Sequence, residues 1–379
     1  MNVGWPVKKL GEVCQTGSGG TPLKAKKEYY DGGTIPWLLS GEVGQGEVQA
    51  TNSFITRKGL ENSAAKIFPK NTVLVAMYGA TAGQVGILRF DAATNQAVCG
   101  ILPNKQFVPE FLFYFLLSRK DELVAKASGN AQPNISQIKI RNTDVPIPPL
   151  PEQHRIVGIL DKAFDGIATA KANAEKNLQN ACALFESHLQ SVFTQRGEGW
   201  VEKTVDQIST NLDSKRIPIT KSDRTSGEYP YYGASGIVDY VADYIFDGDT
   251  LLVSEDGANL LARSTPIAFS VSGKYWVNNH AHILKFKNIA TQRFVEFYLE
   301  SIKVDEYITG AAQPKLNQKA LNSIPIPIPK STDAQAQIVE SIESLFTETQ
   351  HLESIYQQKL DAIDELKKSL LHQAFSGHL

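Results

Sequence analysis

The chain repeats one long segment of its own sequence, and this repeat constrains the fold more than any other feature. Residues 129–157 read GNAQPNISQIKIRNTDVPIPPLPEQHRIV, and residues 310–339 read GAAQPKLNQKALNSIPIPIPKSTDAQAQIV. The shared Gln-Pro pairs begin at Gln132 and Gln313, which are 181 positions apart in a chain of 379 residues. Solenoid repeats span only roughly 20 to 50 residues, so each copy must be a whole domain with an attached segment.

Other motifs recur in the same order at unequal distances. Trp5 corresponds to Trp200, NTVLVAMYGA at residues 71–80 corresponds to DTLLVSEDGA at residues 249–258, and Asn95 corresponds to Asn279. The offsets vary between 178 and 195 positions, so the framework is kept while the loops differ in length. Unequal loops on equal frameworks indicate two binding modules with different targets.

A long helix is expected after each copy. Apolar or small residues recur there in steps of three and four, which predicts a single coiled-coil seam with occasional stutters. The predicted seam positions are Ile156, Leu160, Ala163, Ile167, Ala170, Ala174, Leu178, Ala181, Phe185, Leu189 and Val192 in the first helix, and Ile338, Ile342, Leu345, Leu352, Tyr356, Leu360, Ile363, Leu366 and Leu370 in the second.

A helix of this length with one apolar seam needs a partner, and the chain contains two that match. We therefore expect an antiparallel coiled coil and a pseudo-twofold axis, in preference to two helices packed on their own domains. Thr332 and Gln335 have the spacing of a capping box at the start of the second helix. The proline runs before the helices, VPIPPLPEQ and IPIPIPKS, are predicted to be stiff, extended connectors.

The modules themselves contain strand-like runs such as TVLVAM and HILKF, separated by Gly, Asn and Asp. The predicted fold class is α+β, with two mostly β domains that carry short helices and are separated by the two long helices. The predicted boundaries are 1–150 for the first recognition module, 151–195 for the central helix, 196–328 for the second module and 329–379 for the distal helix.

Composition limits the cellular location and the kind of binding partner that the chain can have. Three cysteines, Cys14, Cys99 and Cys182, show neither disulfide nor metal spacing, which favours a reduced, cytoplasmic location. The densest apolar run, residues 111–117, is far shorter than a membrane span. The formal net charge is −2, and only residues 1–150 are basic, with 16 Lys and Arg against 11 Asp and Glu. A nucleic-acid-binding chain of this charge would rely on partners for much of the phosphate contact.

No catalytic set is recognisable. The glycine-rich residues 17–22 and 79–86 lack the features of a P-loop, and turn glycines explain them better. The acidic group Asp249, Glu255 and Asp256 lacks the lysine of a metal-dependent nuclease. His280 and His282 alternate along a predicted strand, but no third ligand follows at metal spacing. We therefore predict no catalytic residues and no metal site.

The remaining polar loop residues suit DNA recognition, because Lys and Arg bind phosphate or guanine while Asn and Gln pair with adenine. For each one alone, a solvated loop residue is the simpler interpretation. The candidates in the first module are Ser18, Thr21, Lys24, Lys26, Lys27, Tyr78, Thr81, Gln84, Asn95, Gln96, Asn130, Gln132 and Asn134; those in the second are Lys215, Arg216, Lys221, Arg224, Tyr231, Ser235, Asn259, Arg263, Asn279, Gln313, Lys315 and Asn317.

Two groups of residues keep alternative interpretations. Gln132 in the first module and Gln313 in the second are equivalent, although the modules should read different sequences, so bracing of their own loops is the alternative interpretation. Glu255 and Asp256 can accept hydrogen bonds from cytosine, or they can form a turn.

In combination these motifs resemble the specificity subunits of type I restriction-modification systems. The resemblance rests on GGTP at residues 19–22 with IPWL at 35–38, TVL-x-x-x-x-GAT-x-G at 72–83, TNQ at 94–96, the proline and EQ-x-x-IV motif at 147–157, and AFSG at 374–377. It covers essentially the whole chain. The second module departs from it, with YPYYGASG, SEDGANLL and NNH in place of IPWL, MYGATAGQ and TNQ, which implies a different target.

The resemblance implies a non-catalytic subunit that binds double-stranded DNA. Each module would read one half of a gapped site, and the helices would set the spacing between the halves. Two modification subunits that use S-adenosylmethionine and restriction subunits that use ATP and Mg²⁺ would be the partners, and this chain would bind no cofactor itself. The alternative is a two-headed protein–protein adaptor without DNA specificity, which the near-neutral charge favours slightly.

Overall fold

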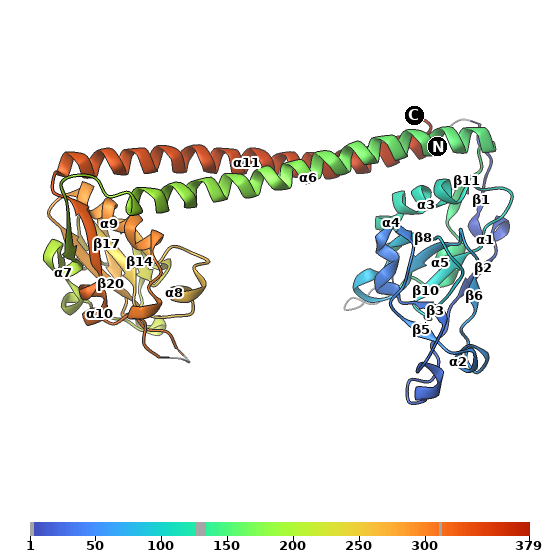
Figure 1. Ribbon diagram of the computed structural model, residues 1–379, viewed down its shortest axis with the longest axis horizontal. Helices are drawn as coiled ribbons and strands as arrows, with labels where there is room; N and C mark the ends of the chain where they lie inside the picture. Colours follow the sequence, from blue (N-terminus) through green and yellow to red (C-terminus); the bar gives the residue numbers. More distant parts are fainter. Residues whose placement is uncertain (1–3, 126, 128–133, 311–312) are drawn as a thin grey trace. The chain divides into compact units, whose positions relative to one another are not determined.

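The computed structural model describes residues 4–125, 127, 134–310 and 313–379. The chain forms two compact units, Met1–Ala174 with Gln358–Leu379 and Glu175–Gln357 (Figure 1). Each unit contains one mostly β module and part of each long helix, so the unit boundaries cross the helices. No helix in the described ranges is both long and apolar enough to span a membrane.

The first unit contains two larger sheets and a two-stranded ladder. The five-stranded sheet has the order β2-β10-β7-β8-β4, the four-stranded sheet has the order β5-β3-β9-β6, and β1 pairs with β11. The strands are β1 (Val7–Lys9), β2 (Thr16–Ser18), β3 (Ile35–Leu38), β4 (Glu47–Val48), β5 (Phe54–Ile55), β6 (Ile67–Phe68), β7 (Val73–Ala76), β8 (Val85–Leu88), β9 (Ala92–Thr94), β10 (Val98–Ile101) and β11 (Asp144–Pro146).

The second unit repeats this plan with different loops. Its first sheet has the order β13-β20-β17-β18, its second has the order β15-β14-β19-β16, and β12 pairs with β21. The strands are β12 (Trp200–Thr204), β13 (Ser209–Asn211), β14 (Ser226–Gly233), β15 (Gly236–Val241), β16 (Phe246–Asp247), β17 (Thr250–Ser254), β18 (Ala268–Val271), β19 (Lys274–Val277), β20 (Ala281–Phe286) and β21 (Pro325–Pro329).

Short helices connect and cover the sheets. In both units a longer one, α3 or α9, follows the central strand β10 or β20. The helices of the first module are α1 (Leu10–Val13), α2 (Arg57–Glu61), α3 (Pro109–Ser118), α4 (Lys120–Ala125) and α5 (Gln137–Arg141), with 3-10 turns η1 (Lys27–Tyr29), η2 (Ser40–Gln45) and η3 (Gly79–Thr81); those of the second are α7 (Val205–Ile208), α8 (Asn259–Ala262), α9 (Ile289–Ser301) and α10 (Gln318–Ser323), with η4 (Asp213–Lys215), η5 (Lys221–Asp223) and η6 (Asp305–Tyr307).

The two long helices are α6 (Leu150–Thr194) and α11 (Thr332–Ser376), and they pair antiparallel within each unit (Figure 1). In the first unit, the Arg155 guanidinium donates to the Leu379 carbonyl at 2.8 Å, and Lys171 Nζ lies 3.1 Å from Asp364 Oδ1. In the second, the Phe185 and Phe346 rings have centroids 5.0 Å apart. The predicted α+β class and antiparallel pairing are confirmed.

The predicted seam is correct along α6, where every seam position is buried or half-buried. Along α11 it is wrong at Leu352 and Leu366, whose exposed fractions are 37% and 49%. Thr349 is buried instead, with an exposed fraction of 1%. Its hydroxyl donates to the Leu345 carbonyl at 3.0 Å, so a polar residue is satisfied at a seam position that an apolar pattern cannot predict.

An aromatic residue near the end of one long helix anchors each module. In the first unit, Phe375 of α11 makes edge-to-face contacts with Phe111 and Phe115 of α3, at 5.3 and 5.5 Å. In the second, Phe193 of α6 contacts Phe294 and Tyr298 of α9 in the same way, at 5.3 and 5.2 Å. These rings lie in the main core of each unit, which explains the AFSG motif as a packing feature.

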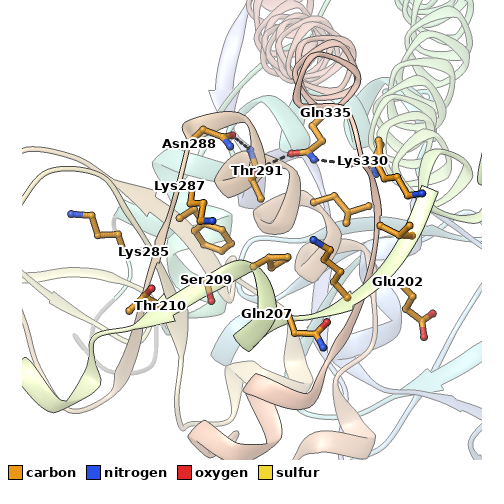
Figure 2. A pocket seen from close by; sticks show the side chains of 16 residues that line it. Glu202, Gln207, Ser209, Thr210, Lys285, Lys287, Asn288, Thr291, Lys330 and Gln335 are labelled. Atoms are coloured by element: carbon orange, nitrogen blue, oxygen red, sulfur yellow. Dashed lines mark hydrogen bonds between the residues drawn. The ribbon is translucent and has the colours of Figure 1, made fainter. Parts of the chain in front are cut away.

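A buried glutamine fixes the start of each long helix. Gln153 accepts a hydrogen bond from the Val108 amide at 2.8 Å and donates to the Pro148 carbonyl at 2.9 Å. Its counterpart Gln335 accepts from the Thr291 hydroxyl at 2.6 Å and donates to the Pro329 carbonyl at 2.7 Å (Figure 2). Each glutamine thus joins its helix to α3 or α9 and to the proline strand.

Two local predictions need correction. Gln335 does not form a capping box with Thr332, since its amide makes the contacts just described, and the Ser331 hydroxyl accepts from the Ala334 amide at 3.3 Å instead. The proline runs are extended, but they are not free connectors. Residues Pro325–Pro329 pair with β12, and Ile326 and Ile328 of that strand are buried. Proline is tolerated there because a two-stranded ladder has a free edge.

Replacing Gln335 with alanine is expected to destabilise the second unit by about 1–3 kcal/mol, because the buried Thr291 hydroxyl and Pro329 carbonyl lose their partner. Urea-induced unfolding measures the loss. Gln337→Ala is the matched control, because Gln337 is exposed two positions along the same helix. Equal unfolding midpoints for the two variants would show that the glutamine does not anchor the helix.

Candidate nucleic-acid interface

In the first unit, several candidate loops meet at one end of the five-stranded sheet. β7 ends and β10 begins there, and the Met77 amide donates to the Ala97 carbonyl at 2.7 Å. The Ile135 amide donates to the Met77 carbonyl at 2.8 Å, and the Gly20 amide donates to the Thr94 carbonyl at 2.9 Å. The backbone therefore joins the segments that follow β2, β7 and β9 to the segment that precedes α5.

The side chains at this end are mostly accessible. The Thr21 hydroxyl donates to Gln96 Oε1, and exposed Tyr78 forms a bridge with Asn134. Thr81 lies beside Tyr78, since its hydroxyl donates to the Tyr78 carbonyl at 3.3 Å. The fold thus brings together predicted residues that are far apart in the chain.

Other candidates of the first module have different environments. The exposed Lys24, Lys26 and Lys27 lie on the segment after Thr21. Asn95 accepts from the Ala97 amide at 3.2 Å and so braces its own turn. Ser18 on β2 and Gln84, which packs against Gly44, are half-buried, and Asn134 forms a bridge with Tyr78. Asn130 and Gln132 lie outside the described residues.

The same sheet end in the second unit has the same backbone connections. The Glu255 amide donates to the His280 carbonyl at 2.9 Å, and the Leu316 amide donates to the Glu255 carbonyl at 2.8 Å. Strand pairing gives the correspondence, since Val98 pairs with Ala76 as Ala281 pairs with Ser254. Glu255 therefore takes the place of Met77, and His280 takes the place of Ala97. The predicted correspondence of Asn95 with Asn279 is wrong by one position, because Asn278 accepts from the His280 amide as Asn95 accepts from the Ala97 amide.

The structure contradicts four predicted DNA contacts in the second module, because these side chains are buried or bond to other residues of the module. Tyr231 is completely buried, and the Arg224 guanidinium lies 4.3 Å above its ring and 3.1 Å from Asp239. Arg263 donates to the Ile302 carbonyl at 2.6 Å after the end of α9. Arg216 is only 14% exposed and pairs with Glu255 at 2.7 Å.

Two further candidates stabilise local structure. Asn259 accepts from the Thr265 amide at 3.0 Å, and Asn317 caps α10 by accepting from the Ala320 amide at 3.0 Å. The candidates that remain exposed for contact with a ligand are Lys215, Lys221, Ser235, Asn279, Gln313 and Lys315.

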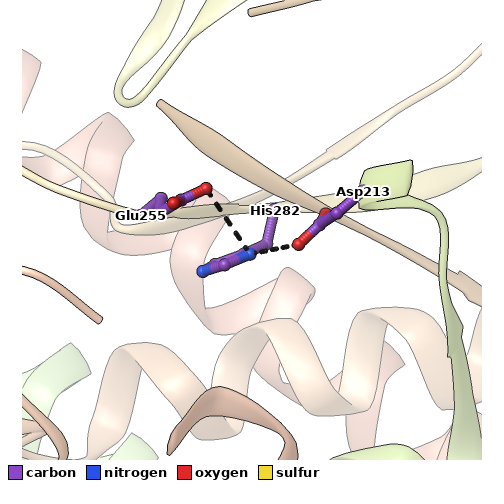
Figure 3. Close-up of side chains that lie close together, drawn as sticks. All are labelled: Asp213, Glu255 and His282. Atoms are coloured by element: carbon purple, nitrogen blue, oxygen red, sulfur yellow. Dashed lines mark hydrogen bonds and ion pairs between the residues drawn. The ribbon is translucent and has the colours of Figure 1, made fainter. Parts of the chain in front are cut away.

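A buried ion network lies beneath this sheet end, and no sequence motif predicted it. His282 is 1% exposed, and its Nδ1 lies 2.5 Å from Asp213 Oδ2 (Figure 3). Its Nε2 lies 2.7 Å from the Leu316 carbonyl oxygen. Glu255, whose side chain is 11% exposed, pairs with Arg216 at 2.7 Å and with Lys315 at 3.1 Å. The network therefore ties the segments at 213–216, 255–257 and 315–316 to one another.

The charges of this network favour ionised carboxyl groups. Burial raises the pKa of Asp213, but the hydrogen bond and charge of His282, the Ile283 amide and the charge of Arg216 together outweigh burial, so the pKa lies below its usual value. Burial likewise opposes ionisation of Glu255, yet the hydrogen bonds from Arg216 and Lys315 lower its pKa. Both carboxylates thus balance cations at the sheet end.

Asp213, Glu255 and His282 also have the ligand types of a metal site, with atoms within 4.8 Å of one another. Each of these atoms, however, already has a partner, and Arg216 and Lys315 supply positive charge beside Glu255. The arrangement is an ion-pair network that needs no metal. His280 does not join it, because its ring faces Asp256.

The network belongs to the second module only. At the positions of Glu255 and His282, the first module has Met77 and Cys99, which lie in the apolar core of the first unit. Burial raises the pKa of the Cys99 thiol to about 12. The two modules therefore share a backbone at this sheet end but differ completely in the side chains beneath it.

A separate cavity of about 1000 Å³ lies at the other end of β20, beside Gln335 and Thr291 (Figure 2). Lysine side chains line much of it: Lys203, Lys285, Lys287 and Lys330, with Glu202 as the acidic residue. Because it adjoins Phe286 and the start of α11, this basic groove is distinct from the loop interface at Ala281.

The family model of the type I restriction modification DNA specificity domain matches residues 2–179 and 197–362. The chain belongs to this family. Each match contains one module and most of the long helix that follows it, so the internal repeat is a tandem pair of specificity domains. This confirms the resemblance to type I specificity subunits that the sequence motifs indicated.

Individual relatives agree with this assignment. A putative type I restriction enzyme specificity subunit of Haemophilus influenzae is 34% identical over 184 residues, which span 44% of this chain and about half (47%) of that protein. The EcoprrI specificity subunit of Escherichia coli is 24% identical over 370 residues, which span 92% of this chain and 90% of that one. A solved structure described as showing complex assembly and conformational transition of the type I R-M system has a TM-score of 0.81 at 18% identity, over 100% of this chain and 99% of that one, which shows a shared fold.

Proposed function

We propose that this type I specificity subunit binds a gapped DNA site, with one half of the site read by each recognition module. The loop end of each module's first sheet is the reading surface, and the paired long helices set the gap between the halves. The chain supplies sequence recognition and assembly, and it carries out no chemistry of its own.

The comparison of the two modules supports this proposal most directly. At the loop end the backbone connections repeat, as the Met77–Ala97 and Glu255–His280 hydrogen bonds show. The side chains do not repeat: exposed His280 stands where the first module has Ala97, and buried Glu255 and His282 beneath it stand where the first module has Met77 and Cys99. A constant frame with variable side chains is what reading two different DNA sequences requires, because base edges are distinguished by donors and acceptors.

We further propose that the partners are two modification subunits, which use S-adenosylmethionine, and restriction subunits, which use ATP and Mg²⁺, all acting in the cytoplasm. Apolar side chains exposed on the long helices support docking of other proteins there. They include Leu184 on α6 and Leu352 and Ile355 on α11, with exposed fractions of 50%, 37% and 42%.

Co-expression with its own modification subunit, in a host without other adenine methylation, is expected to place methyl-adenine at a single gapped motif. Single-molecule sequencing of the host genome measures the motif. Omission of the specificity subunit is the control and should leave the genome unmethylated. Methylation without a motif, or none with an active partner, would instead favour the two-headed protein adaptor.

A further inference from the structure

His280 is an exposed histidine whose ring is fixed by a carboxylate at the loop end of the second module. Its Nδ1 lies 2.9 and 3.0 Å from the two carboxylate oxygens of Asp256. The His280 side chain is 47% exposed, whereas that of Asp256 is only 16% exposed. The Asp256 carboxylate therefore lies beneath the His280 ring and holds it in place, while the ring itself faces solvent.

The backbone of His280 is fixed as well. Its amide donates to Asn278 Oδ1 at 2.8 Å, and its carbonyl accepts from the Glu255 amide at 2.9 Å. Glu255 itself is held by Arg216 and Lys315 in the buried network. The position of the imidazole thus depends on a rigid base rather than on a flexible loop, which is what precise contact with a ligand requires.

The hydrogen bond to Asp256 determines what the other ring nitrogen offers. A carboxylate that accepts from Nδ1–H leaves Nε2 of the neutral ring as an acceptor. Among the described residues, Nε2 of His280 makes no hydrogen bond. In this neutral form, the side chain presents an oriented acceptor to solvent.

A small polar pocket adjoins this acceptor. It has a volume of about 230 Å³, and its lining includes Arg224, Asn279 and His280. Nε of Arg224 is buried and has no acceptor within the described part of the chain. Because Asp239 and the Tyr231 ring hold this guanidinium, it forms a fixed wall of the pocket beside His280.

We propose that His280 is a specificity-determining residue of the second module, where its Nε2 accepts a hydrogen bond from an exocyclic amine of one base. The bases with such an amine in the major groove are adenine and cytosine. The first module has Ala97 at this position and cannot make the contact, so the contact contributes to the difference between the two half-sites. This inference rests on the proposed function.

The test is the methylation motif of variants co-expressed with the modification subunit. His280→Ala is expected to relax one position of one half of the motif, with roughly tenfold less preference for the amine-bearing base. Asp256→Asn removes the constraint on the ring, so keto bases become acceptable at that same position. His351→Ala, an exposed histidine on α11, is the matched control and should leave the motif unchanged.

The outcomes separate the two proposals. Absence of a gapped motif with the unaltered chain contradicts the proposed function itself. An unchanged motif in both His280→Ala and Asp256→Asn, with normal methylation, overturns only the role of His280. His280→Gln guards against a folding defect, because it retains a side-chain acceptor. Equal loss of every position in that half with both His280→Ala and His280→Gln would also overturn the role.

Discussion

Replacing Glu255 with alanine is expected to destabilise the second unit by about 3 kcal/mol, because it leaves the largely buried guanidinium of Arg216 without its closest partner. Breaking a buried pair from one side typically costs about 3–5 kcal/mol. The lower end applies here, since Asp213 remains 3.7 Å from Arg216. The loss of the Lys315 contact also releases the segment before α10.

Hydrogen exchange in increasing urea measures this effect for each unit separately. Peptides from β17 and β20 should exchange at lower urea in the variant, whereas peptides from β7 and β10 should be unchanged. Glu202→Ala is the control, since Glu202 lies 3.7 Å from Arg196 and both side chains are more than half exposed. Such exposed pairs contribute only about 0–1 kcal/mol. Equal effects of the two substitutions would contradict the structural role of the network.

The sequence predicts the fold well because the chain contains two copies of the same domain and helix. The two copies identify the framework by what they share, and the seam periodicity identifies the long helices. Prediction failed where a polar residue took an apolar role, as with Thr349, or where a side chain bonded to its own domain, as with Gln335. Such exchanges depend on tertiary contacts, and periodicity does not record them.

The candidate site was predicted less completely. Converging loops were expected correctly, since strand ends that match in sequence lie at the same sheet end. The predicted DNA contacts of Tyr231 and Arg216 were wrong, because the sequence of a polar loop does not show which side chains point into the domain. The ion network was missed because Asp213 and His282 are 69 positions apart, and no local motif links them.

His280 was considered only as a partner of His282 in a metal site. Alternation along a strand predicted that the two rings share one face. β20 begins at Ala281, however, so His280 belongs to the preceding turn, and its ring bonds to Asp256 instead. The sequence alignment of NNH with TNQ places His280 opposite Gln96, one position away from its structural counterpart Ala97, so the repeat alone did not identify the residue that differs.

Exchange of residues 1–150 for the first module of another type I specificity subunit is expected to replace one half of the methylated motif completely. The second half should be retained, because His280, Lys315 and the other residues of its reading surface lie in the second module. The gap should be retained too, since residues 151–195 and 329–379 are unchanged. The reciprocal exchange of residues 196–328 is the matched control and should replace the other half.

The most direct measurement is therefore the methyl-adenine motif of the two exchange variants, read by single-molecule sequencing beside that of the unaltered chain. The account predicts that each exchange changes one half, that the two halves differ, and that the gap is constant. Exchanges that change both halves together, or that leave the motif as it was, would contradict the claim that each module reads its own half of the site.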